Sequence, residues 1–167
     1  VQTCALPICT HLERYFDCLQ KLGALDTLYP GLTKAHITQA AYAKSLCNDD
    51  TMVYAFLCHG LKDIPVVFEK ADKKTKQYAH LANHYYGVAI NQMARSYQDI
   101  LALVKALSLH SKTPDYQGLE FLCSCWGHLA TYKKDTLHCD LHPKLIDIGK
   151  AIAAIDYKAL KQESSNQ

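Results

Sequence analysis

The stretch that decides the fold is KTKQYAHLANHYYGVAINQMARSYQDILALVKALSL, residues 74–109. Its apolar side chains recur every three or four residues, which is the spacing of one face of an α-helix. The residues on this face are Tyr78, Leu81, Ala82, Tyr85, Ala89, Met93, Ile100, Leu103, Val104 and Leu107. We therefore predict one continuous helix over 74–109, which would be about 50 Å long at about 1.5 Å per residue.

The same spacing recurs on both sides of this stretch. Upstream it covers 12–22, which Gly23 ends, then 33–46, which Thr33 can cap, and 50–61, which follows the break at Asn48–Asp50. Downstream it covers 119–129 and 145–155, after a loop at 110–116. No segment alternates with period two for long enough to predict a strand. The sequence predicts an all-α fold, with five to seven helices in a bundle or a short antiparallel helical-hairpin array.

The length of 167 residues suits one domain. We expect a single helical domain over 9–162 and a frayed polar tail over 163–167. The first eight residues, VQTCALPI, resemble the translated sequencing-adapter peptide that can remain at the ends of assembled contigs, and the chain does not begin with Met. We therefore expect residues 1–8 to be non-native and the chain to be a fragment of a longer product.

Charge and hydropathy argue against two classes of partner. Eighteen Lys and Arg residues stand against 16 Asp and Glu residues, with no long block of either sign, so we expect no nucleic-acid partner. No apolar run approaches the roughly 20 residues of a membrane-spanning helix, and no basic segment leads into an apolar one at the N-terminus. We expect no membrane span and a cytoplasmic location.

The chain is cysteine-rich, with eight cysteines. It is too long to resemble a small secreted domain that depends on disulfides, and it has no Asn-x-Ser/Thr sequon. Cys18, Cys47, Cys58 and Cys123 lie beside the apolar positions of helical patterns, where a free thiol behaves as a small hydrophobic side chain. We therefore predict reduced thiols.

One region could bind a metal. Cys123-x-Cys125-x2-His128 is followed by His138, Cys139 and His142, and thiolate and imidazole are the ligands that zinc prefers. Cys123 and Cys125 would point about 200° apart on a continuous helix, so the candidate ligand set is Cys125, His128, His138 and His142. The alternative is that buried helical cysteines lie beside loop histidines with no metal, and we predict no other cofactor.

Two further groups of side chains could have a function. His80 and His84 are four residues apart, the spacing by which two imidazoles can share a metal, but they fall on the polar side of the helix and the glutamate of the zinc-protease motif is absent. This favours a solvated helix face. Tyr85, Tyr86 and Tyr97 could line a groove or an interaction surface. Alternatively, they fill a helical core with their hydroxyls at its edge.

A family resemblance rests on three short runs. Residues 68–71 (FEKA), Leu81-Ala82-x-x-Tyr85-Tyr86 and 148–152 (IGKAI) resemble the helical scaffold domain of Alix-type endosomal-sorting adaptors. The shared positions are mostly those that any array of helical hairpins would show. No site residue is therefore transferred from that family.

The absence of common enzyme motifs favours a non-catalytic function. The sequence has no Glu-x-x-His pair, no Cys-x-x-Cys-His, no Gly-x-Ser-x-Gly and no phosphate-binding glycine loop. The leading hypothesis is a helical protein–protein interaction or scaffold module, with a protein partner or with self-association. The alternative is a zinc-binding protein or metal-dependent enzyme that uses the 123–142 region.

Overall fold

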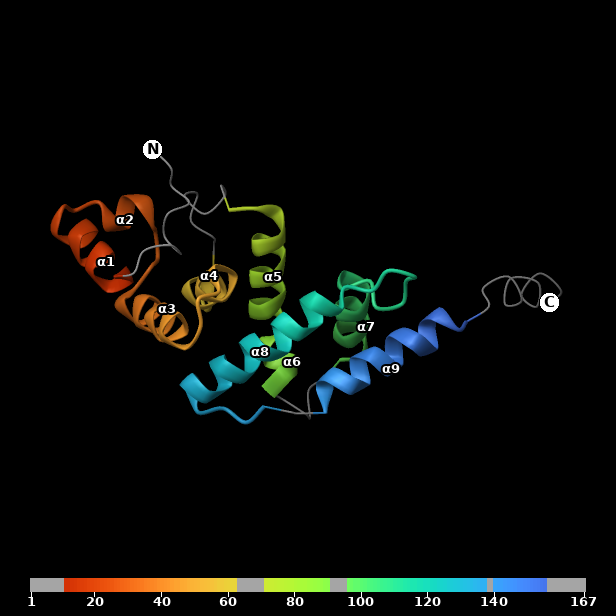
Figure 1. Ribbon diagram of the computed structural model, residues 1–167. Coiled ribbons are helices and arrows are strands. Elements are labelled where there is room, and N and C mark those ends of the chain that lie inside the picture. The colour runs from red at the N-terminus through yellow and green to blue at the C-terminus, as the bar shows by residue number, and fades with distance from the viewer. Residues whose placement is uncertain (1–10, 63–70, 91–95, 138–139, 156–167) are drawn as a thin grey trace.

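A computed structural model describes residues 11–62, 71–90, 96–137 and 140–155. Figure 1 shows helices that follow one another from α1 to α9 in an elongated array. The described residues form nine helices and no strand: α1 (Leu12–Lys21), α2 (Leu25–Leu28), α3 (Lys34–Leu46), α4 (Asp50–Cys58), α5 (Lys73–His84), α6 (Tyr86–Ile90), α7 (Tyr97–Ala106), α8 (Tyr116–Lys133) and α9 (Leu141–Ala153). The all-α prediction is confirmed, with more helices than the five to seven predicted.

The prediction of one continuous helix over 74–109 is wrong. The stretch contains α5, α6 and α7. Helix α5 ends at His84, and the backbone of the next residue, Tyr85, leaves the helical region (φ −98°, ψ 7°). Helix α7 begins after Ser96, which is extended (φ −65°, ψ 132°). The Ser96 hydroxyl accepts a hydrogen bond from the Gln98 backbone N–H at 3.1 Å, so Ser96 is the N-cap of α7.

Other helices begin or end at residue types that favour a helix terminus. Gly23 has a left-handed backbone (φ 67°) directly after α1, and the Ala24 N–H donates back to the Leu19 carbonyl at 2.9 Å. This is the hydrogen bond of a glycine-terminated helix. Thr33 precedes α3, and the Asp115 carboxylate caps α8 by accepting from the Gly118 N–H at 2.9 Å.

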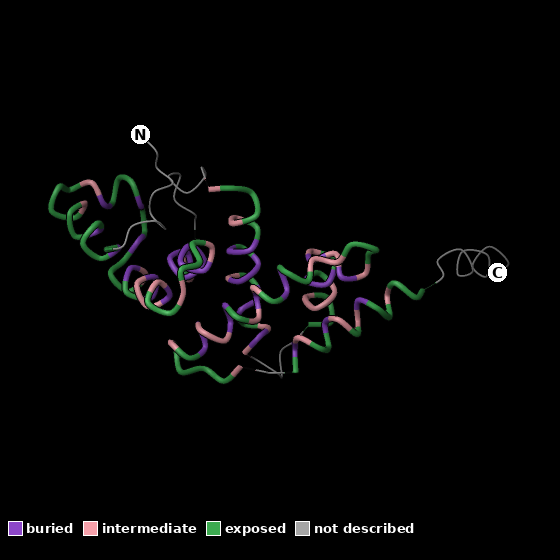
Figure 2. The backbone as a smooth tube through the Cα atoms, viewed as in Figure 1, coloured by how far each residue is buried: buried purple, intermediate pink, exposed green. Residues whose placement is uncertain are grey.

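Helix α4 is the centre of the N-terminal half, where it lies between α3 and α5 (Figure 1). Every residue from Met52 to Cys58 is buried, so this helix is apolar on all sides (Figure 2). A helix of that kind is stable only when other elements cover its whole circumference. Its polar ends therefore need partners from the neighbouring helices.

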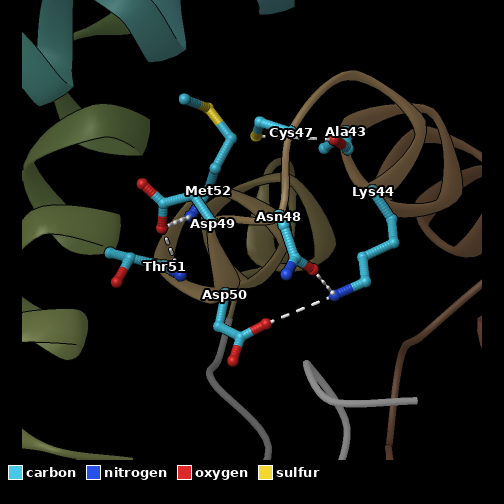
Figure 3. Close-up of polar contacts among 8 residues, drawn as sticks. All are labelled: Ala43, Lys44, Cys47, Asn48, Asp49, Asp50, Thr51 and Met52. Carbon is cyan, nitrogen blue, oxygen red and sulfur yellow. Dashed lines mark hydrogen bonds and ion pairs between the residues drawn. The ribbon is translucent and has the colours of Figure 1, made fainter. Parts of the chain in front are cut away.

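The start of α4 is held by short-range contacts (Figure 3). The Asp49 carboxylate accepts from the backbone N–H groups of Thr51 and Met52 at 2.8 and 3.2 Å. Lys44 of α3 donates to the side-chain oxygens of Asn48 at 2.9 Å and Asp50 at 3.5 Å. Asp49 is therefore the N-cap of α4, within the break at Asn48–Asp50, and a cap of this kind stabilises a helix by about 1 kcal/mol.

Helix α8 joins the two halves of the array. Its Trp126 is 1% exposed, and the indole N–H donates to the Ala82 carbonyl of α5 at 2.8 Å. Helix α9 packs against the end of α7 through Gly149, where an added Cβ would lie 2.6 Å from the Leu109 carbonyl oxygen. The close approach therefore requires glycine at this position.

Several predictions fall partly or wholly outside the described residues. The adapter-like segment 1–8, the tail 163–167 and the candidate ligand His138 all lie there. Within the described residues, Cys18, Cys47, Cys58, Cys123 and Cys125 are free thiols. In the same residues, no helix combines the length and the apolar character needed to cross a membrane.

Candidate functional sites

The structure does not bring the described zinc-ligand candidates together. Cys125 lies in the buried face of α8, and burial raises the pKa of its thiol, which disfavours the thiolate that binds zinc. His128 and His142 are half-buried on α8 and α9, and His138 lies outside the described residues. Across the described ranges, no three His, Cys, Asp or Glu side chains form a group that could hold a metal ion.

The three tyrosines singled out from the sequence have different surroundings. Tyr85 and Tyr86 are 8% and 5% exposed, so they fill the core and do not present an exposed surface. The Tyr86 hydroxyl donates to the Asp135 carboxylate at 2.7 Å, at the edge of that core. Tyr97, the first residue of α7, is 71% exposed. Tyr97 is separated from Tyr85 and Tyr86 by the break before α7. A helical wheel drawn for one continuous helix could not show this separation.

Two side-chain amides, the buried Gln39 and the half-buried Asn83, hold the end of α4, and sequence analysis did not identify them. Gln39 of α3, which is 7% exposed, donates through Nε2 to the carbonyls of Phe56 at 2.6 Å and His59 at 3.0 Å. Asn83 of α5 donates through Nδ2 to the Ala55 carbonyl at 3.2 Å. These bonds supply partners to carbonyls of the last turn, where an α-helix has none of its own.

A polar cluster extends from this end of α4 toward α8. The His59 ring lies 2.9 Å through Nδ1 from the Asn83 Oδ1 and 3.3 Å through Nε2 from the Lys133 ammonium. Because Lys133 can only donate, Nε2 is the acceptor and Nδ1 carries the proton. Burial lowers the pKa of His59, the Asn83 bond opposes that shift, and the nearby Lys133 charge adds to it. His59 is therefore held in its neutral form.

A pocket opens beside this cluster, between the end of α4 and the second half of α5. Its volume is about 390 Å³. Three of its lining residues are the histidines His59, His80 and His84. His80 and His84 are exposed, as the polar helix face predicted, and their rings are stacked with centroids 5.5 Å apart.

A larger pocket of about 560 Å³ lies between the first turns of α4 and α5 and the first half of α8. We call it the three-helix pocket. Its lining residues combine both charges with hydroxyl and aromatic groups: Asp49, Thr51, Met52, Asp72, Lys74, Thr75, Tyr78, Gln117, Glu120, Phe121 and Ser124. The helical spacing of apolar residues did not indicate this pocket, because its lining residues come from segments up to 75 residues apart, from 49 to 124.

The apolar part of the three-helix pocket is a pair of stacked rings. Tyr78 and Phe121 lie with centroids 5.3 Å apart and planes inclined by 23°. The Tyr78 hydroxyl donates to both carboxylate oxygens of Asp115, at 2.9 and 2.8 Å. Lys74 lies 5.3 Å from the centre of the Tyr78 ring and donates to the Gln117 side-chain oxygen at 2.6 Å. These contacts hold the Tyr78 ring in place and link the exposed side chains of Lys74 and Gln117 across the pocket.

Comparisons with known proteins add no homologue. No protein-family model, no curated protein and no solved structure matches the chain. The functional argument therefore rests on the geometry of the chain itself.

Proposed function

We propose that this chain is a helical protein–protein interaction module that binds a segment of its partner in the three-helix pocket. The observation that carries the proposal is the stacked pair Tyr78–Phe121, which lines an open pocket between three helices. Aromatic side chains are enriched at protein interfaces because they offer a large apolar surface. In this pocket the half-buried Phe121 supplies the accessible apolar surface, and Tyr78, which is only 5% exposed, stacks against it from the core side.

The charges around the pocket favour a partner with basic residues. Its described lining holds the carboxylates of Asp49, Asp72 and Glu120 and a single ammonium, that of Lys74. This mainly acidic lining suits a polypeptide segment that carries an apolar side chain beside basic residues. Charges at the rim of an interface contribute more to specificity and to the association rate than to affinity.

Preorganisation supports the same function. Tyr78 and Lys74 of α5 donate hydrogen bonds to the start of α8, Tyr78 to Asp115 and Lys74 to Gln117. Side chains that are already ordered lose little conformational entropy on binding, and each such side chain avoids a cost of about 0.5–1.5 kcal/mol. A pocket with fixed walls can therefore bind a short segment with useful affinity.

A pair of substitutions on α8 tests the proposal. Ser124→Arg places a long charged side chain in the three-helix pocket, and Thr131→Arg places the same side chain on the same helix, outside the pocket; both positions are exposed. Proteins captured by the wild-type chain should be lost with Ser124→Arg and kept with Thr131→Arg. Equal capture by both variants, or no protein captured above the empty matrix, would refute the proposal.

Self-association and zinc binding are the other functions predicted from the sequence. Sedimentation at increasing concentrations measures self-association, and a partner that proves to be a second copy of the chain would give a mass that rises with concentration. The zinc alternative at 123–142 stays a prediction. Elemental analysis of protein purified without chelator, combined with His138→Ala and His142→Ala, tests it, because zinc at a structural site contributes directly to folding.

A further inference from the structure

We infer that His80 and His84 form a two-histidine site for a divalent transition-metal ion, separate from the ligand set predicted at 123–142. The two residues occupy successive turns of α5. Their rings are nearly parallel, with an interplanar angle of 16° and centroids 5.5 Å apart. Two imidazoles four residues apart on one helix face can bind the same ion through one ring nitrogen each.

Both rings are available to an ion from solvent. His80 and His84 are exposed, and they line the 390 Å³ pocket from the same side. Within the described part of the chain, neither ring takes part in a hydrogen bond; the contacts of His84 are to the rings of His80 and Tyr85. A metal would therefore not have to displace an existing partner from either ligand.

Among the described residues no third side chain is placed to complete the coordination, so water would fill the remaining positions. His59 lines the same pocket, but Asn83 and Lys133 occupy both of its ring nitrogens. In the described residues no group of three potential ligands comes together, which agrees with two protein ligands and no more. A site with two protein ligands and open positions exchanges its ion readily and does not act as a structural zinc site.

The pocket also selects the class of ion. Its described lining contains imidazoles, the amide of Asn83 and the thiol of Cys58, whose pKa is raised by burial so that the thiolate is disfavoured, but no carboxylate. The Lys62 ammonium weakens the binding of every cation and sets no preference among them. Magnesium and calcium need oxygen ligands and usually carboxylates, so they should not bind. Imidazole suits nickel, copper and zinc, and the affinity should rise from Mn²⁺ through Co²⁺ and Ni²⁺ to Cu²⁺.

The test uses the full chain without a histidine tag and Ni²⁺ as the probe. Titration calorimetry should show that the wild type binds one equivalent of Ni²⁺. In His80→Ala and in His84→Ala the affinity for Ni²⁺ should fall at least about tenfold, since replacing a residue that only orients a metal ligand already lowers metal affinity about 10–100-fold. His128→Ala, a half-buried histidine on α8, should bind Ni²⁺ as the wild type does. Wild-type affinity in both α5 variants, or no binding to the wild type at millimolar Ni²⁺, would overturn the inference.

A second measurement needs no variant. Paramagnetic Ni²⁺ should broaden the ring resonances of His80 and His84 in the wild-type NMR spectrum before those of any other histidine. Broadening that begins at another histidine would overturn the inference. A further variant tests the geometry: His84→Ala with Gln77→His places a new pair on the same exposed face at a spacing of three residues, so part of the lost affinity should return.

Discussion

Replacing Gln39 should show how strongly the buried amide stabilises α4. Gln39 is 7% exposed and donates through Nε2 to the carbonyls of Phe56 and His59, at 2.6 and 3.0 Å. Methionine has nearly the same length and volume and no amide. Gln39→Met therefore keeps most of the packing between α3 and α4 and removes both hydrogen bonds.

The expected decrease in the free energy of unfolding follows from the hydrogen bonds that the two carbonyls lose. Each hydrogen bond contributes about 0.5–1.5 kcal/mol, and a buried acceptor left without a partner costs about 1–3 kcal/mol. The Phe56 carbonyl still accepts from the His59 N–H at 3.2 Å, so among the described residues only the His59 carbonyl is left without another partner. We expect Gln39→Met to lower the free energy of unfolding by about 2 kcal/mol. Gln39→Glu should cost more, because its carboxylate would face two carbonyl oxygens.

Urea denaturation followed by far-ultraviolet circular dichroism measures this loss. The matched control is Thr38→Ala, an exposed neighbour on α3, which should change the free energy of unfolding by less than about 0.5 kcal/mol. A Gln39→Met variant as stable as Thr38→Ala would refute the assignment of Gln39 to the end of α4. A Gln39→Glu variant more stable than Gln39→Met would refute it as well.

Three other perturbations have definite expected outcomes. Gly149→Ala should destabilise the protein by more than about 1 kcal/mol, because the added Cβ would clash with the backbone of Leu109. Gly87→Ala should stabilise it by about 0.5–1 kcal/mol, because nothing lies within 4 Å of the added Cβ. Equal thermal melting temperatures of the two variants would contradict this. Burial lowers the pKa of His59 below 6.5, so the unfolded chain takes up the proton first and stability should fall as the pH drops through 6.5. Urea melts at several pH values should show that slope flattened in His59→Gln, and an unchanged slope would contradict the assignment. Exposed Cys18 should react with a maleimide in the native protein, while Cys58, whose pKa burial raises to about 12, should react only on unfolding; mass spectrometry finding equal rates would contradict this.

The sequence pattern predicts helices such as α8 well because they bury a stripe with helical spacing. Leu119, Leu122 and Trp126, which defined the pattern of α8, are all at most 1% exposed. The breaks inside 74–109 were missed because the apolar spacing continues across them. Ser96 and Asp99 did carry a signal, since Ser-x-x-Asp at the start of an apolar run is typical of a helix N-terminus.

The candidate sites were largely invisible to pattern analysis. Gln39 and Asn83 each bond to carbonyls at least 17 residues away, and a periodicity identifies a buried face but not its partner. Tyr78 was assigned to the core from its spacing, and it also lines the three-helix pocket with Phe121 of another helix. Only His80 and His84 could be paired in advance, because their contact lies within one helix.

Photo-crosslinking from the three-helix pocket tests the proposed function most directly. A benzophenone side chain at Glu120 faces the pocket, and the same side chain at Thr131 lies on α8 outside it; both residues are exposed. If the chain binds a protein partner in this pocket, irradiation in cells should give a crosslinked product from position 120 and none from position 131, and Ser124→Arg should abolish it. Crosslinking of equal strength from both positions, or from position 131 alone, would contradict binding in the three-helix pocket.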